Sequence, residues 1–326
     1  MEKFNRKYGN SFIDLLANLA RTVSRKSAKA QSFIIFLLLC AFLFANCRSE
    51  SPQVSADLQT REVADDLGRT VKIPETIERA VSLAPNLTEI IFAVGAGGKL
   101  VGVTSFCNYP AAAREITKIG DTMNPNLEAI IAQKPQVVFV STDSQIENFT
   151  RRMQEQNIAV FVTDAKNLEG VLQNIKQIGD VLGTTEQAEK LIADLQERIG
   201  EIESKVKDKK PPKVFVQISN SPIYTIGKDS FITDLVHRAG GVSLTENIPT
   251  AYPNLSKETA LAFEPEAIIL SESPDNQEPN EAFKNSPAVK NKRVYKINAD
   301  LLSRPSPRIV DALEEMARAL HAESFE

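Results

Sequence analysis

Residues 126–140 have the sequence NLEAIIAQKPQVVFV, in which a short helix-forming segment, a Lys-Pro pair and an apolar run follow one another. The run Val137–Val140 is rich in β-branched and aromatic residues, which is typical of a strand buried in a parallel sheet. Residues 258–270, ETALAFEPEAIIL, repeat the order of glutamate, alanine, proline and apolar run at an offset of 130 residues. The repeat predicts two related lobes; a chance similarity between two helix–proline–strand units is the alternative.

Outward from these two units, segments that favour strands alternate with segments that favour helices. The expected strands are 79–83, 100–104, 137–140, 159–162, 214–218, 267–270 and 294–297. The expected helices are 87–94, 126–133, 149–156, 167–182, 230–239 and 309–320. Asn86 with Glu89 three residues later resembles a capping box at the start of the first helix. The alternation predicts α/β sheets with parallel strands.

A longer helix is expected between the two halves, over residues 185–207, because its apolar residues fall on one helical face. About 23 residues at 1.5 Å each give a rod of roughly 34 Å. The sequence therefore predicts an N-terminal α/β lobe over 61–184, a bridging helix over 185–210 and a C-terminal α/β lobe over 211–326. A single rod between two lobes permits only a small hinge motion.

The first 46 residues differ from the rest, since they hold seven of the 38 basic and only two of the 42 acidic residues. Their apolar run, residues 33–45, is too short to cross a hydrocarbon core of about 30 Å as a helix and fits a signal peptide. The run ends in Phe44-Ala45-Asn46-Cys47, which is similar to a lipobox. We expect a signal peptide over 1–46, lipidation at Cys47 and a polar tether over 47–60. An uncleaved anchor helix and a start codon downstream of Met1 are the alternatives.

Charge and metal-ligating residues argue against several classes of protein. The chain after the leader is net acidic, so a nucleic-acid partner is not expected. Cys107 is the single thiol beyond Cys47, and it cannot form an internal disulfide once Cys47 is lipidated. The two histidines, His237 and His321, are far apart in sequence, so a His-rich metal site is not expected. No G-x-S-x-G elbow, P-loop or H-E-x-x-H motif is present, so an enzyme is not expected.

Several motifs together resemble one family. They are Asp66-Leu-Gly-Arg69, Arg79-Ala-Val-Ser-Leu-Ala-Pro85, Cys107-Asn-Tyr-Pro110, Asn126-Leu-Glu128, Thr225-Ile-Gly-Lys-Asp-Ser230, Tyr252-Pro253 and Ser306-Pro-Arg308. Over about residues 63–321 the chain resembles the periplasmic cobalamin and Fe(III)-siderophore binding proteins, most of all the vitamin B12 binders. The resemblance implies two Rossmann-like lobes joined by one backbone helix, with a cleft for a corrinoid or ferric chelate. A ferric siderophore or haem is the alternative ligand to cobalamin, and no resident cofactor or metal is implied.

The resemblance also implies which side chains contact the ligand. They are Phe106, Tyr252, Asp300 and Arg304. Aromatic walls offer contact area to a flat ligand, and amide groups accept hydrogen bonds from arginine. The chain departs from the B12 binders because it has no Trp, with Thr122 and Val140 at the places of their cleft tryptophans. Core packing of the two aromatic residues and solvation of Arg304 are the alternatives.

The same resemblance implies that Glu128 and Glu258 dock an ABC permease dimer with its ATPase subunits, one glutamate in each lobe. A first-turn carboxylate favoured by the helix dipole is the alternative for both. Cys107 is expected to be a buried small apolar residue. We therefore expect a monomer of the periplasm or cell envelope, held at a membrane by its lipid. A surface adhesin or structural lipoprotein is the rival function.

Overall fold

The computed structural model describes residues 59–141 and 146–326, which belong to one compact unit of residues 58–326. The predicted signal peptide, Cys47 and all but the last two residues of the predicted tether lie outside the described residues. Thr60, the last tether residue, already belongs to strand β1 (Thr60–Ala64), which forms an antiparallel hairpin with β2 (Thr70–Pro74). Among the described helices, none combines the length and the hydropathy that a membrane crossing needs.

The N-terminal lobe is built on a parallel sheet with the strand order β4-β3-β5-β6. The strands are β3 (Ala80–Ser82), β4 (Leu100–Val103), β5 (Val137–Ser141) and β6 (Ala159–Thr163). Helices α3 (Pro85–Ala93) and α6 (Leu168–Leu182) pack on one face, and α4 (Leu127–Ala132) and α5 (Ile146–Gln154) pack on the other. Val137 and Phe139 face the first pair of helices while Val138 and Val140 face the second, which explains the uninterrupted apolar run of β5.

The C-terminal lobe repeats this arrangement. Its parallel sheet has the order β12-β11-β7-β9. The strands are β7 (Lys213–Gln217), β9 (Val242–Ser243), β11 (Ala267–Glu272) and β12 (Val294–Asn298), and the helices include α8 (Phe231–Arg238), α9 (Lys257–Leu261), α10 (Pro287–Lys290), α11 (Ala299–Leu302) and α12 (Ile309–Leu320). If the strands of each parallel sheet are numbered in chain order within their lobe, both sheets place them in the same spatial order: second, first, third, fourth. The repeated units α4–β5 and α9–β11 therefore occupy equivalent places, as the hypothesis of two related lobes requires.

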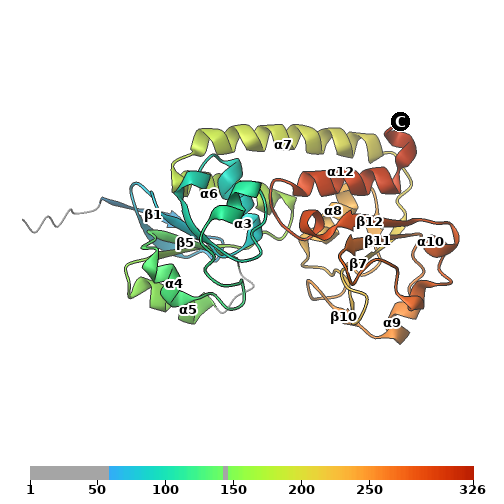
Figure 1. The fold of residues 1–326 in the computed structure, drawn as a ribbon. Coiled ribbons are helices and arrows are strands. Elements are labelled where there is room, and N and C mark those ends of the chain that lie inside the picture. The colour runs from blue at the N-terminus through green and yellow to red at the C-terminus, as the bar shows by residue number, and fades with distance from the viewer. Residues whose placement is uncertain (1–58, 142–145) are drawn as a thin grey trace, which may run out of the picture. The chain divides into compact units, whose positions relative to one another are not determined.

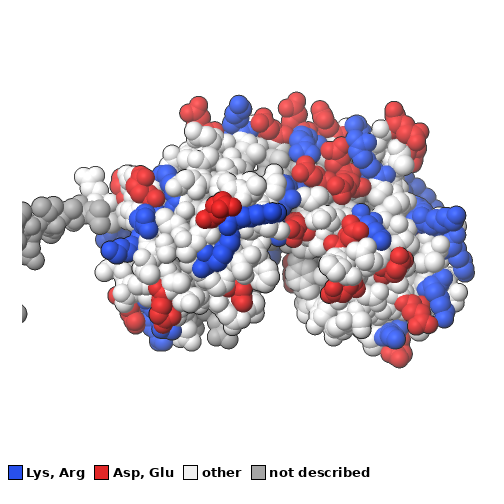
Figure 2. All heavy atoms as spheres, viewed as in Figure 1, with Lys and Arg blue, Asp and Glu red and all other residues white. Residues whose placement is uncertain are grey.

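Helix α7 (Thr185–Val206) runs along both lobes and packs against α6 in the first and α12 in the second (Figure 1). The apolar face predicted for it is buried, including Ala188, Leu195 and Ile202. One apolar cluster continues from the N-terminal sheet through α6 and α7 to α12. The outer side of α7 carries charged side chains of both signs (Figure 2). Two parallel α/β sheets with one backbone helix confirm the predicted fold class.

The start of α3 differs from the prediction. The helix begins at Pro85, Ala84 occupies the N-cap position, and no side chain caps the helix. Proline at the first helical position has its φ already set for a helix and has no N–H to satisfy, so the helix starts before Asn86. The predicted capping box of Asn86 and Glu89 is therefore wrong. Helix α5 also begins and ends earlier than predicted.

Candidate ligand-binding site

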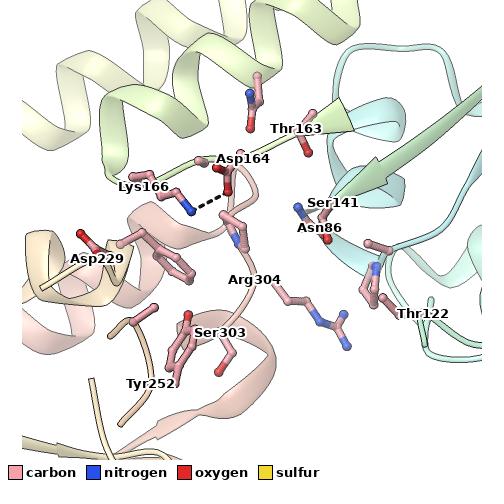
Figure 3. Close-up of a pocket in the computed structure, with 17 residues that line it drawn as sticks. Asn86, Thr122, Ser141, Thr163, Asp164, Lys166, Asp229, Tyr252, Ser303 and Arg304 are labelled. Atoms are coloured by element: carbon pink, nitrogen blue, oxygen red, sulfur yellow. Dashed lines mark ion pairs between the residues drawn. The ribbon is translucent and has the colours of Figure 1, made fainter. Parts of the chain in front are cut away.

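A cavity of about 300 Å³ lies between the two lobes (Figure 3). The N-terminal lobe lines it with polar side chains at the carboxyl ends of its strands. They are Asn86 after β3, Ser141 at the end of β5, and Thr163, Asp164 and Lys166 at and after the end of β6. The C-terminal lobe contributes Asp229, Tyr252, Ser303 and Arg304. Ligands of open α/β sheets bind at the carboxyl ends of the strands, so the cavity lies where such a fold binds small molecules.

Tyr252 lies on a loop that packs against the segment after β8 (Ile223–Tyr224). The backbone N–H of Thr225 donates to the carbonyl of Pro253 over 3.1 Å, and that of Gly227 donates to the carbonyl of Ala251 over 2.9 Å. A Cβ on Gly227 would lie 1.9 Å from the carbonyl oxygen of Thr250, so only glycine permits this approach. The close packing holds Tyr252 at the cavity with 43% of its surface exposed.

Glu89 of α3 connects the N-terminal lobe to the segment that follows α11. Its side chain is almost fully buried, with the residue 3% exposed. It accepts hydrogen bonds from Arg304 Nη1 at 2.9 Å, Ser306 Oγ at 2.6 Å and Arg308 Nη2 at 2.6 Å. A buried carboxylate is stable only when it is paired and hydrogen-bonded, and here every partner comes from the other lobe.

Arg304 has further partners on both lobes. Its Nη1 donates to Asn108 Oδ1 over 2.7 Å, and its Nη2 pairs with Asp300 Oδ1 at 2.6 Å. Asn108 Nδ2 donates in turn to Asp300 Oδ2 over 2.9 Å. The guanidinium of Arg308 lies 4.0 Å from the ring centre of Tyr109, which is a cation–π contact. The loop of residues 104–110 is thereby attached to the C-terminal lobe.

The charges around Glu89 act on the titration of its partner. Burial alone would lower the pKa of Arg308, but the hydrogen bond and the negative charge of Glu89 outweigh burial, and the pKa is raised above its ordinary value. The same bonds that link the two lobes therefore favour the charged form of the Arg308 guanidinium.

A second polar contact joins the lobes beside the cavity. The backbone N–H at the start of α6, on Leu168, donates to Asp234 Oδ2 of α8 over 2.9 Å. Arg238 of α8 pairs with Glu169 of α6, with Glu203 of α7 and with Asp234. Two separate groups of polar contacts therefore link the N-terminal lobe to the C-terminal lobe.

The structure brings together some of the predicted ligand contacts. Tyr252 and Arg304 line the cavity, and Asp300 reaches it only through its ion pair with Arg304. Phe106 is 59% exposed and does not line the cavity, although the next residue but one, Asn108, binds Arg304. Packing in the core is therefore excluded for Phe106 and Tyr252.

The two positions where the B12 binders have tryptophan have different environments. Thr122 lines the cavity, but Val140 is 1% exposed and packs in the core between β5 and its helices. Because side chains alternate along a strand, the cavity receives Ser141 instead of Val140. The placement of Val140 in the cleft was therefore wrong.

The remaining predicted residues lie away from the cavity. Cys107 is buried and accepts a hydrogen bond from Thr88 Oγ1 at 3.1 Å, as expected for a small core residue. Glu128 and Glu258 are exposed in the first turns of α4 and α9. A hydrogen bond from its own backbone and another from Ser256 hold the pKa of Glu258 below its usual range. Within residues 59–141 and 146–326, no three His, Cys, Asp or Glu side chains cluster as metal ligands would.

The polar lining of the N-terminal lobe was missed by the sequence analysis. Asp164 and Lys166 form an ion pair of 2.7 Å, and the largely buried Asn174 of α6 lines the same cavity. A usable signal was present, because Ser141 and Thr163 each follow a continuous apolar run and so lie at the carboxyl end of a buried strand.

Residues 81–301 match the periplasmic binding protein family. A Bacillus subtilis protein named as an uncharacterised ABC transporter substrate-binding lipoprotein is 29% identical over 304 residues, which cover 89% of this chain and 96% of that protein. The vitamin B12-binding protein of Vibrio cholerae is 28% identical over 249 residues, which cover 76% of this chain and 90% of that protein.

Two examples of solved structures with the same fold are both periplasmic binding proteins. The periplasmic vitamin B12 binding protein of Vibrio cholerae superposes with a TM-score of 0.67 and 26% identity, covering 77% of this chain and 99% of that one. A molybdate periplasmic binding protein of Haemophilus influenzae superposes with a TM-score of 0.71 and 23% identity, covering 81% of this chain and 92% of that one. From the family match and the shared two-lobed architecture, the chain belongs to the periplasmic binding protein family, a family of substrate-binding transport proteins and not of enzymes.

Proposed function

We propose that this protein is the substrate-binding lipoprotein of an ABC importer and that it captures cobalamin or a related corrinoid between its lobes. The observation behind the proposal is the interlobe cavity, where the ring of Tyr252 and the guanidinium of Arg304 line one space. Relatives named as vitamin B12-binding proteins, at 28% identity over most of their length, support the choice of ligand.

The chemistry of the cavity suits the edge and face of a corrin ring. A flat macrocycle gains contact area and dispersion energy on an aromatic face such as Tyr252. Three of the five N–H groups of Arg304 bind Glu89, Asn108 and Asp300 within the part of the chain that the structure describes, which leaves two for a ligand oxygen. The amide side chains of a corrin offer such oxygens, and an amide N–H on a part of the ligand outside the cavity would be able to donate to the exposed carboxylate of Asp300.

The size of the cavity sets how a corrinoid would sit. A volume of about 300 Å³ is at the lower end of typical ligand sites. A corrinoid is larger than most ligands of such sites, so part of it would project out of the cavity. Phe106, which is exposed outside the cavity on the loop that Asn108 anchors, is proposed to cover the projecting part.

A ferric siderophore or haem is the second candidate ligand. Its support is the phenol of Tyr252, since phenolate oxygen is a ligand of ferric iron, together with Lys166 and Arg304 as partners for carboxylates. The test is to incubate the full chain with cyanocobalamin, haemin or a ferric hydroxamate, pass it over a sizing column and record the absorbance spectrum. Co-elution of cyanocobalamin supports the first candidate, and co-elution of an iron complex alone replaces it with the second.

Delivery of the ligand requires a permease, and we assign docking to Glu128 and Glu258. The two exposed carboxylates occupy equivalent places of the two lobes, in the first turns of α4 and α9. A permease dimer with two-fold symmetry would meet one glutamate with each subunit. A lipid on Cys47 would hold the monomer at a membrane of the cell envelope, and the intact mass of membrane-extracted protein tests that anchor.

A further inference from the structure

The carboxylate of Glu89 accepts four hydrogen bonds, two from Arg308 and one each from Ser306 and Arg304. Arg308 binds both of its oxygens, with Nη2 2.6 Å from Oε1 and Nε 3.0 Å from Oε2, and Ser306 adds a bond to Oε2. A forked arginine–carboxylate pair of this kind already compensates the buried charge. The bond from Arg304 fills the fourth acceptor position of the carboxylate, and it also restrains the orientation of Arg304.

The guanidinium of Arg304 is held from two sides. Glu89 and Asn108 of the N-terminal lobe bind Nη1, while Asp300 of its own lobe binds Nη2. These contacts fix the plane of a group that in solution rotates about several bonds, and they direct the remaining N–H groups. Only 11% of the Arg304 side chain is exposed, although it lines the cavity. Figure 3 shows this side chain extending from the C-terminal loop toward the N-terminal lobe.

We propose that Glu89 is a positioning residue of the binding cleft: it acts on the ligand through Arg304, whose guanidinium it holds in the orientation that meets a ligand oxygen. The inference rests on the proposed function only in placing a ligand against Arg304. Glu89 itself does not line the cavity. Since Glu89 and Arg304 belong to different lobes, the same bond also joins the segment 303–308 to the N-terminal lobe.

A double-mutant cycle tests the route through Arg304. Glu89→Gln, Arg304→Gln and the double variant are compared with the wild type in equilibrium dialysis against cyanocobalamin, with haemin as the alternative probe. Glu89→Gln is expected to weaken binding about tenfold or more, because a charge-assisted hydrogen bond is lost. In the Arg304→Gln background the same change is expected to cost less than about threefold. Losses that multiply in the double variant would overturn the proposal, because Glu89 would then act independently of Arg304.

Hydrogen exchange of the ligand-free protein separates this proposal from the proposed function. Glu89→Gln is expected to speed amide exchange in residues 104–110 and 303–308 and to leave the strands of both sheets unchanged. The matched control is Glu314→Gln, which removes ion pairs with Arg198 and Arg318 on helices away from the cavity and leaves those two segments unchanged. Unchanged exchange in 303–308 of Glu89→Gln overturns the positioning role even when neither probe binds the wild type.

A conservative variant keeps the test valid if Glu89→Gln fails to fold. Arg304→Lys retains the positive charge, but an ammonium group cannot contact Glu89, Asn108 and Asp300 in the planar geometry of a guanidinium. We expect an unchanged melting temperature within a few degrees and binding of the probe weakened about tenfold. Binding of Arg304→Lys as tight as that of the wild type would overturn the proposal.

Discussion

Replacing Tyr252 by alanine tests whether the ligand covers this ring. The residue is 43% exposed in the structure, so a stacked ligand would remove about 90 Å² from water if a large aromatic side chain offers about 200 Å². At about 25 cal/mol per Å² the loss is about 2 kcal/mol, which is a factor of about 30 in affinity. Specific stacking adds about 0.5–1.5 kcal/mol.

Calorimetric titration with cyanocobalamin measures the loss, and two further variants interpret it. Tyr252→Phe keeps the ring, so a stacked corrinoid should bind within about threefold of the wild type, whereas an iron bound through the phenolate would be lost as in the alanine variant. Tyr224→Ala is the control, because Tyr224 is similarly exposed but does not line the cavity. If Tyr252→Ala binds cyanocobalamin as tightly as the wild type does, the ligand does not cover this ring.

Three further expectations concern the supporting structure and the docking surface. Gly227→Ala should weaken cyanocobalamin binding at least tenfold and lower the melting temperature. The Cβ of the alanine would lie 1.9 Å from the carbonyl oxygen of Thr250 and would displace the loop that carries Tyr252. Normal binding by this variant would show that the position of the loop is unimportant. The double variant Glu128→Ala/Glu258→Ala should bind the ligand within about 0.5 kcal/mol of the wild type but strongly reduce uptake into reconstituted vesicles. Glu186→Ala, which removes an exposed glutamate from the first turn of α7, is the control. Normal uptake by the double variant would mean that both glutamates serve only as helix-start residues. The hydrogen bond from Arg318 lowers the pKa of Glu314 in the folded protein. Glu314 therefore stabilises the fold at pH values above the ordinary glutamate pKa, and this stabilisation is lost as the pH falls through the lowered pKa of the folded state. Thermal melts of Glu314→Gln should therefore differ from the wild type at pH 7 and converge with it in acid, and a constant difference would contradict this linkage.

Much of the fold could be predicted because it depends on local periodicity. The apolar runs of β5 and β11 identify strands buried on both faces, and the single apolar face of α7 identifies a helix covered on one side. The equivalence of α4–β5 and α9–β11 also followed from a repeat in the sequence. An apolar run and an apolar helical face are both visible within a short stretch of sequence, so neighbours in the chain contain the information.

The interlobe contacts could not be predicted in this way. Glu89 lies 215 residues from Arg304 and 219 from Arg308, and a glutamate three residues after an asparagine also fits a capping box. Only Pro85 indicated that the helix starts earlier and that Glu89 belongs to its interior. The cavity lining was similarly hidden, since Ser141 and Val140 are adjacent in sequence and face opposite environments.

Above all, we propose that a metal-bearing organic ligand occupies the cavity between the lobes. A crystal structure of the protein grown with saturating cyanocobalamin tests it most directly. We expect density for the corrin in contact with Tyr252 and Arg304, with its projecting part near Phe106. Corrin density at another surface, or an empty cavity at a saturating concentration of cyanocobalamin, would contradict the proposal of a corrinoid ligand. If the cavity is also empty in crystals grown with haemin and with a ferric siderophore, the proposal of a metal-bearing ligand is wrong altogether.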